Sequence, residues 1–141
     1  MTTDYDIQTE SAFLETTELK GSILVVDDEP AICVVMGIIL KLNGYCVYRA
    51  HNVPQAYSYL EEIKPDLIVV DIMMPGVDGL TMIRQIKARQ EYSDIPTVVL
   101  SALASEQDKE AALQAGADAF LAKPFTSQEL SDVVEPILSN T

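Results

Sequence analysis

Basic residues are scarce in this chain. Of its 141 residues only nine are Lys or Arg, against 22 Asp or Glu, and the formal net charge is −13 at pH 7. A protein this acidic repels the phosphate backbone of nucleic acids, whose binding depends on Lys and Arg contacts. We therefore expect no direct nucleic-acid partner, and any effect on DNA would have to pass through another protein.

Long hydrophobic runs are also missing. The longest apolar run covers residues 31–40, well short of the roughly 18 apolar residues that predict a membrane span. The first residues, Met-Thr-Thr-Asp-Tyr-Asp, have neither the basic start nor the apolar core of a secretory signal. These absences predict a protein that has no membrane partner and remains in the cytoplasm.

Cysteine is rare too. Cys33 and Cys46 are not spaced like the ligands of a metal-binding motif, and two such residues are typical of buried free thiols in a reducing compartment. With 48% hydrophobic residues, the chain is long enough for one domain whose core needs neither a disulfide nor a structural metal. We expect residues 1–21 to form a mobile acidic extension and residues 22–139 to form the domain.

The stretch from Asp66 to Gly79 is the centre of the sequence. Residues 67–70, Leu-Ile-Val-Val, are a short unbroken apolar run, which is typical of a strand buried on both faces of a parallel sheet. Asp71 ends the run, and Pro75 together with two glycines prevents the following loop from continuing the strand. Asp71 is therefore predicted at the carboxyl end of a central strand, where open α/β sheets bind ligands.

Similar apolar runs alternate with helical patterns along the rest of the chain. Strands are predicted at residues 22–26, 45–50, 67–70, 97–100 and 117–122, and helices at residues 30–43, 53–63, 80–90, 105–116 and after Thr126. Thr126 and Glu129 have the spacing of a capping box, and Pro136 is expected to end or kink the last helix. This alternation predicts an α/β fold, a doubly wound five-stranded parallel sheet with helices on both faces.

Four of the predicted strands are followed directly by polar residues: Asp27 with Asp28, Asp71, Ser101 and Lys123. The carboxyl ends of parallel strands share one edge, so three carboxylates, a hydroxyl and an ammonium should converge there. Clustered carboxylates repel one another, and oxygen ligands suit Mg²⁺, which together with the lysine would bring the charge to zero. Such a site can take up a transferring phosphoryl group on an in-line carboxylate.

In these residues and their order, the chain resembles the receiver domain of bacterial two-component response regulators, such as the chemotaxis regulators, over about residues 22–139. The resemblance implies a flavodoxin-like (βα)5 three-layer sandwich. It also implies that Asp71 accepts a phosphoryl group from a histidine kinase or a histidine phosphotransfer protein. The protein would then be a signalling protein and not a conventional enzyme, with self-phosphorylation and slow autodephosphorylation as its only reactions.

The resemblance further implies a metal site for Mg²⁺ or Mn²⁺. Asp28 would bind the ion directly, Asp27 would bind it mainly through water, and Met73 would bind it through its backbone carbonyl, next to Asp71 itself.

Three more positions have roles implied by the resemblance. Lys123 would assist the transfer, and its bond to Pro124 would be cis. Ser101 and Phe120 would be the switch residues. On phosphorylation, the face formed by residues 105–116, residues 117–122 and the final helix would change and signal to a downstream protein target.

The same residues argue against several other functions. A dinucleotide-binding enzyme needs Gly-x-Gly-x-x-Gly after its first strand, whereas the turn after residue 26 is acidic. A phosphatase with an aspartyl nucleophile usually has a general acid two residues later, and Met73 holds that position. A purely structural domain would lack a site residue, and none is missing. The alternative left open is a receiver that serves as a phosphate shuttle or sink in a phosphorelay.

Few residues follow the last predicted helix. We therefore favour a single-domain regulator over the amino-terminal piece of a longer protein.

The first predicted helix is apolar on both sides. A core-facing stripe accounts for Ile32, Val35, Met36 and Ile39. The other side should be polar, but it carries Cys33, Val34, Gly37 and Ile38. We expect these four residues to form a patch that docks the phosphodonor. The alternatives are scattered surface residues, cover by the extension through Phe13 and Leu14, and self-association.

Overall fold

The structure is a computed structural model of the chain and describes residues 19–74 and 78–139. The segment 1–18, with Phe13 and Leu14, lies outside the described residues, as do Pro75 and the two residues after it. In the described part, no helix is long and apolar enough to cross a membrane.

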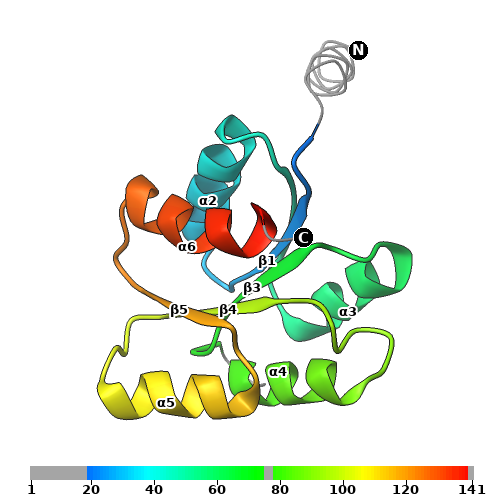
Figure 1. Cartoon of the computed structure of the whole chain (residues 1–141), viewed down its shortest axis with the longest axis vertical. Coiled ribbons are helices and arrows are strands. Elements are labelled where there is room, and N and C mark those ends of the chain that lie inside the picture. The colour runs from blue at the N-terminus through cyan, green and yellow to red at the C-terminus, as the bar shows by residue number, and fades with distance from the viewer. Residues whose placement is uncertain (1–18, 75–77, 140–141) are drawn as a thin grey trace.

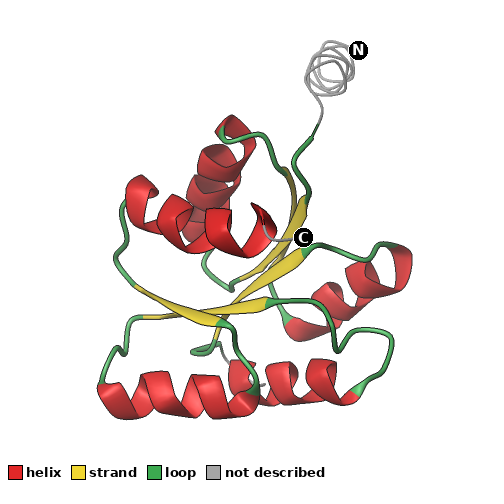
Figure 2. Ribbon diagram, in the orientation of Figure 1, coloured by secondary structure: helices red, strands yellow, loops and turns green. Residues whose placement is uncertain are grey.

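Five parallel strands form one sheet with helices on both faces (Figure 1, Figure 2). The strands are β1 (Ser22–Val26), β2 (Cys46–Ala50), β3 (Leu67–Asp71), β4 (Thr97–Ser101) and β5 (Ala119–Ala122), and their order in the sheet is β2-β1-β3-β4-β5. The helices are α2 (Pro30–Leu42), α3 (Val53–Glu62), α4 (Gly79–Ala88), α5 (Glu106–Ala115) and α6 (Ser127–Ser139). The predicted doubly wound, flavodoxin-like α/β fold is confirmed.

The apolar strands are buried on both faces because their side chains alternate between two cores. Ile23 and Val25 of β1 join the core under α2 and α6, whereas Leu24 and Val26 join the core under α3, α4 and α5. Strand β3 divides its side chains in the same way, and all five of its residues are buried. Runs with no polar residue are therefore required at these central strands, as the sequence indicated.

The parallel register aligns the carboxyl ends of the strands. Asp71, the last residue of β3, is paired with Leu100, and Ser101, the last residue of β4, is paired with Ala122. Lys123 N donates to the Ser101 carbonyl and Asp27 N to the Ala50 carbonyl, so both of these residues continue the sheet by one position. The residues that follow the apolar runs therefore share one edge.

The predicted patch on the first helix is wrong in two of its four residues. Cys33 and Gly37 are buried, whereas Val34 and Ile38 are 45% and 55% exposed. The helix is apolar all round, so its spacing could not show which side faces the core. Cys33 and Gly37 face inward together with Met36 and Leu40. The Cys33 thiol donates to the Asp27 carbonyl, and burial raises the pKa of Cys33 to about 11.

Val35 is also misassigned, because it is 47% exposed and not core-facing. Together with Val34, Ile38 and Leu42, which is 82% exposed, it forms the outward side of the helix. We call these four residues the α2 apolar face. Both cysteines are free thiols, but only Cys33 is buried and Cys46 is half-buried.

The last helix differs from its prediction at one end. Its predicted capping box is present: Glu129 N donates to Thr126 Oγ1 (3.1 Å) and Thr126 N donates to Glu129 Oε1 (2.9 Å). Pro136 does not end the helix, because α6 continues to Ser139. Pro136 is exposed and lies in the last turn, where the missing N–H affects a single hydrogen bond.

Replacing each of two helical glycines by alanine should change the stability of the fold in opposite directions. At Gly79, the first residue of α4, a Cβ would lie 2.5 Å from the Asp71 carbonyl oxygen and 2.6 Å from Ile72 Cα. Backbone atoms cannot easily move away, so Gly79→Ala should destabilise the fold by about 1–3 kcal/mol. At Gly37, the nearest atom to a Cβ is Cδ of the flexible Arg49 side chain at 3.6 Å, so an alanine fits there. Because alanine has the higher helix propensity, Gly37→Ala should raise the free energy of unfolding by at most about 1 kcal/mol.

Urea unfolding of the two variants checks this prediction. Equal free energies of unfolding for Gly79→Ala and Gly37→Ala would contradict the close approach of α4 to the end of β3.

Candidate functional site

Three carboxylates meet at the carboxyl edge of the sheet. Oxygen atoms of Asp27, Asp28 and Asp71 all lie within 4.8 Å of one another. Asp27 follows β1 and is fully buried, Asp71 ends β3 and is 2% exposed, and Asp28 is half-buried. Like charges this close repel strongly, the more so because water is largely excluded from two of them.

A single ammonium group faces this cluster. Lys123 Nζ, which follows β5, lies 2.9 Å from Asp27 Oδ2 and 3.2 Å from Asp71 Oδ2. Although burial lowers the pKa of Lys123, its close contacts with the carboxylates of Asp27 and Glu29 outweigh that effect and raise the pKa above its ordinary value. The lysine is therefore charged at neutral pH.

Glu29 is a site residue that the sequence analysis missed. Its Oε1 lies 2.9 Å from Lys123 Nζ, although the Glu29 side chain is 59% exposed. The signal was its position as the third acid of the run that begins at Asp27, and beyond Asp27 and Asp28 this run was used only to exclude a dinucleotide-binding loop. Three carboxylates thus contact one ammonium, and together with Asp28 the group carries a formal charge of −3.

Ionisation of Asp27 is disfavoured by this arrangement. Burial raises the pKa of Asp27 above its ordinary value of 3.8, and the charge of Asp71 adds to the rise. The Glu29 backbone N–H, which donates to Asp27 Oδ1 at 2.9 Å, and the ammonium of Lys123 only partly oppose it. The buried Oδ2 atom has the ion-pair distance to Lys123 but no hydrogen bond of good geometry.

These residues fit a divalent cation. The donor set consists of carboxylate oxygens, which are the ligands that Mg²⁺ prefers, and the buried Asp27 Oδ2 has spare capacity to accept. A divalent charge would also offset most of the −3 charge of the cluster.

Asp71 presents its two oxygens to different partners. Oδ1 accepts a hydrogen bond from Met73 N at 3.0 Å, and Oδ2 faces Lys123. Met73 is 57% exposed, whereas Asp71 is 2% exposed. Asp71 is thus held by a backbone amide and an ammonium.

The remaining predicted site residues lie on β4 and β5. Ser101 is fully buried, and its Oγ accepts from Leu103 N at 3.0 Å. Phe120, which is paired with Val99, is half-buried and packs on the core under α3, α4 and α5. The peptide bond between Lys123 and Pro124 is cis. The structure therefore brings Asp27, Asp28, Asp71 and Lys123 together, with Ser101 on the neighbouring strand end.

Comparison with known proteins gives one consistent family. The model of the response regulator receiver domain matches residues 23–135. The chain is 37% identical over 120 residues to the phosphate regulon transcriptional regulatory protein PhoB of Pseudomonas aeruginosa, covering 85% of this chain and 52% of that protein. It is 40% identical over 119 residues to the response regulator MprA of Mycobacterium avium, covering 84% and 51%. The chain thus spans about half the length of these curated relatives.

Solved structures agree with these similarities. A putative response regulator from Chloroflexus aurantiacus superposes with a TM-score of 0.80 at 32% identity, covering 84% of this chain and 98% of that chain. The signal receiver domain of a histidine kinase from Syntrophus aciditrophicus gives a TM-score of 0.78 at 33% identity, covering 86% and 92%.

The raised pKa of Asp27 predicts a pH-dependent effect of Asp27→Asn in chelator-treated protein. An acid whose pKa is raised in the folded state binds more protons there than in the unfolded chain, so its contribution to stability falls as the pH rises through the folded pKa. The asparagine keeps the acceptor for Glu29 N but cannot ionise. The free energy of unfolding of the variant, relative to that of the wild type, should therefore increase between about pH 4 and pH 7.

Denaturant unfolding at several pH values measures this difference. Asp78→Asn is the matched control, because Asp78 is an exposed helix cap that accepts from Leu80 N and asparagine caps equally well. A difference for Asp27→Asn that stays flat or decreases with pH would count against the electrostatic cost assigned to this buried carboxylate.

Proposed function

Because the chain belongs to the response regulator receiver domain family, we propose that it accepts a phosphoryl group from a phosphohistidine onto Asp71 in a Mg²⁺-dependent reaction. The observation that carries the proposal is the setting of Asp71. This carboxylate ends the central strand β3, with Lys123 Nζ 3.2 Å from one oxygen and two further aspartates within 4.8 Å.

The acceptor reaction is an in-line displacement. An oxygen of Asp71 forms the new O–P bond while the N–P bond to the donor histidine breaks, and the imidazole keeps the electron pair. The Met73 amide, which donates to Asp71 Oδ1, holds the carboxylate in one orientation. Met73, two residues after Asp71, is 57% exposed, so this end of β3 lies next to the surface from which a donor would approach.

Lys123 and a bound metal would together neutralise the negative charge of the phosphoryl group. Mg²⁺, or Mn²⁺, bound by Asp28, Asp71 and the Met73 carbonyl and through water by Asp27, would neutralise the transferring oxygens. In the resting site Lys123 neutralises part of the charge of Asp27 and Asp71. Its ammonium can turn toward a phosphoryl oxygen once one is present, because it sits within ion-pair reach of the acceptor.

The same phosphoryl group would change the signalling face. Ser101 is one strand away from the acceptor, and its hydroxyl can donate to a phosphoryl oxygen in place of its present contact with Leu103 N. Movement of that loop would free space that the half-buried Phe120 can enter. We infer that the face of α5, β5 and α6 carries the output in this way.

The output would pass to a protein partner. One similar protein is named as a DNA-binding dual master transcriptional regulator, RpaA of Synechocystis, and this chain covers 49% of it. The described domain is acidic, so direct contact of this domain with a phosphate backbone is disfavoured.

The phosphodonor would dock on the α2 apolar face. Helix α2 begins directly after the acidic run, so this face adjoins the acceptor site. It offers Val34, Val35, Ile38 and Leu42 in one exposed row, which suits the apolar side of a helical donor.

Labelling with a small phosphodonor tests the acceptor. Wild-type protein with Mg²⁺ and acetyl phosphate should gain one phosphoryl group in intact mass, and Asp71→Asn should gain none, since an amide is not a nucleophile of this kind. Omitting Mg²⁺ should abolish the labelling of the wild type. Full labelling of Asp71→Asn would falsify the assignment.

An arginine on the α2 apolar face tests donor docking. Ile38→Arg should slow phosphotransfer from the kinase that labels the protein fastest in a panel, by about tenfold if the change costs roughly 1.4 kcal/mol of donor binding. Labelling by acetyl phosphate should persist, and the free energy of unfolding should change by less than about 0.5 kcal/mol because Ile38 is exposed.

The matched control is Leu113→Arg. Leu113 on α5 is also 55% exposed, but α5 packs on the opposite face of the sheet from α2. Equal slowing by Ile38→Arg and Leu113→Arg would refute docking on α2.

A further inference from the structure

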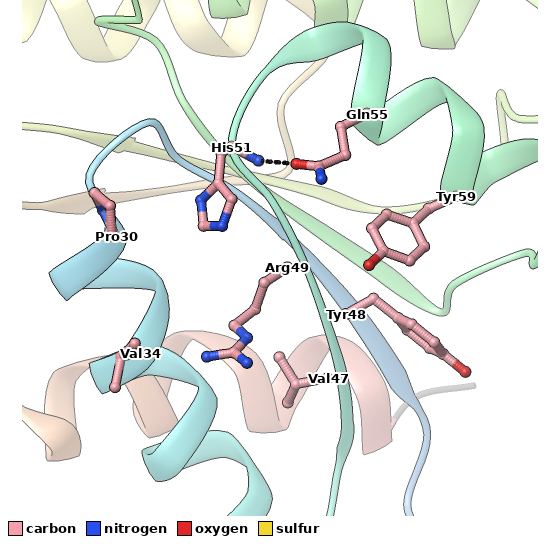
Figure 3. A pocket seen from close by; sticks show the side chains of 8 residues that line it. All are labelled: Pro30, Val34, Val47, Tyr48, Arg49, His51, Gln55 and Tyr59. Carbon is pink, nitrogen blue, oxygen red and sulfur yellow. Dashed lines mark hydrogen bonds between the residues drawn. The ribbon is translucent and has the colours of Figure 1, made fainter.

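A groove runs over the free edge of the sheet. Strand β2 is the first in the sheet order, so its outer side has no strand partner among the described residues. The groove has a volume of about 430 Å³ and lies between α2 and α3, the helices on either side of β2 (Figure 3). Its lining comes from all three elements and from the turn after β2: Pro30, Val34, Val47, Tyr48, Arg49, His51, Gln55 and Tyr59.

The groove has an apolar wall on each side of β2. Val34 and Val47 lie on the α2 side, with the Arg49 side chain between them in Figure 3. Tyr48 and Tyr59 lie on the α3 side with their ring centroids 5.5 Å apart. An exposed strand edge with unpaired backbone groups between such walls is the arrangement that accepts an added extended segment.

The charge of the groove is opposite to that of the chain. No acidic residue lines it, whereas Arg49 and His51 point into it on the α2 side (Figure 3). Arg49 forms no ion pair within the described residues, and its aliphatic part lies over Gly37, so the guanidinium is held at the groove. In a protein of net charge −13, this is a local site for an acidic ligand.

We propose that residues 1–18 of the same chain dock in this groove as an added extended segment. The segment carries Asp4, Asp6, Glu10, Glu15 and Glu18 and no Lys or Arg, so its charge complements Arg49. It also carries Phe13 and Leu14, which match the apolar walls. The groove does not include Asp71, and it shares Val34 with the α2 apolar face.

The attachment point and the length of the segment make docking within one chain favourable. Lys20 N donates to the Gly44 carbonyl and Cys46 N donates to the Gly21 carbonyl, so the segment joins the domain at the start of β2. Five residues of β2 extend over about 17 Å, whereas 18 residues can reach about 60 Å. The chain can therefore reverse next to Gly44 and run antiparallel to β2, and this tethering raises the effective concentration of the segment at the groove.

Photo-crosslinking of the full chain tests the proposal. Phe13 is replaced by p-benzoylphenylalanine, the protein is irradiated, and crosslinked peptides are identified by mass spectrometry in a mixture of light and isotope-labelled chains. We expect crosslinks within one chain to residues 30–42 or 47–59. Crosslinks between light and labelled chains would show a second copy as the occupant and overturn the proposal, as would crosslinks elsewhere or none.

A matched pair of variants tests whether the charge of Arg49 holds the segment. Arg49→Glu should lower the crosslink yield about two- to fivefold, the range expected for loss of an exposed ion pair. Arg84→Glu should leave the yield unchanged, because Arg84 is an exposed residue of α4 that forms no ion pair in the described part of the chain and does not line the groove. Equal yields for the two variants would overturn the assignment of Arg49.

Hydrogen exchange gives a second readout that needs no change in the folded domain. In full-length protein with Phe13→Ser and Leu14→Ser, outward-facing amides of β2 should exchange several-fold faster than in the wild type, whereas the amides of β3 should not change. Unchanged exchange in β2 would contradict the proposal.

Discussion

The excess of carboxylates over ammonium groups at one edge of the sheet is the constraint on which the site depends. Asp27, Glu29 and Asp71 share Lys123 as their near cation, and Asp28 adds a further carboxylate to the cluster. Two of these acids, Asp27 and Asp71, are almost fully buried. Burial of Asp27 beside Asp71 has an electrostatic cost, as the raised pKa of Asp27 indicates. An added divalent cation would offset this cost, and under the proposed function Asp71 would then take the phosphoryl group.

The parallel sheet creates this constraint from residues far apart in the chain. β1, β3, β4 and β5 end at the same edge because they run in the same direction, so one polar residue after each apolar run is enough to assemble the cluster. The close approach of Gly79 to the Asp71 carbonyl fixes where α4 begins, directly after β3 in space. Site geometry and the packing of the helices are thus coupled at the end of β3.

Much of this could be predicted from the sequence because the central strands are apolar on both faces. Their ends stand out, and the predicted convergence of Asp27, Asp71 and Lys123 follows from strand direction alone. The orientation of α2 could not be predicted, since a helix that is apolar all round has no periodicity to indicate its buried side. Cys33 and Gly37 were misassigned for that reason. The contact of Glu29 with Lys123 depends on a side-chain conformation that no spacing reveals.

The most direct test of the central claim is to locate a divalent cation in the cluster. Crystals grown with Mn²⁺ and measured at a wavelength where manganese scatters anomalously should show one peak, roughly 2.0–2.3 Å from carboxylate oxygens of Asp28 and Asp71 and from the Met73 carbonyl. Lys123 should remain within reach of Asp71. A peak only elsewhere, or an empty cluster at saturating Mn²⁺ with Lys123 still neutralising the acids alone, would contradict the account.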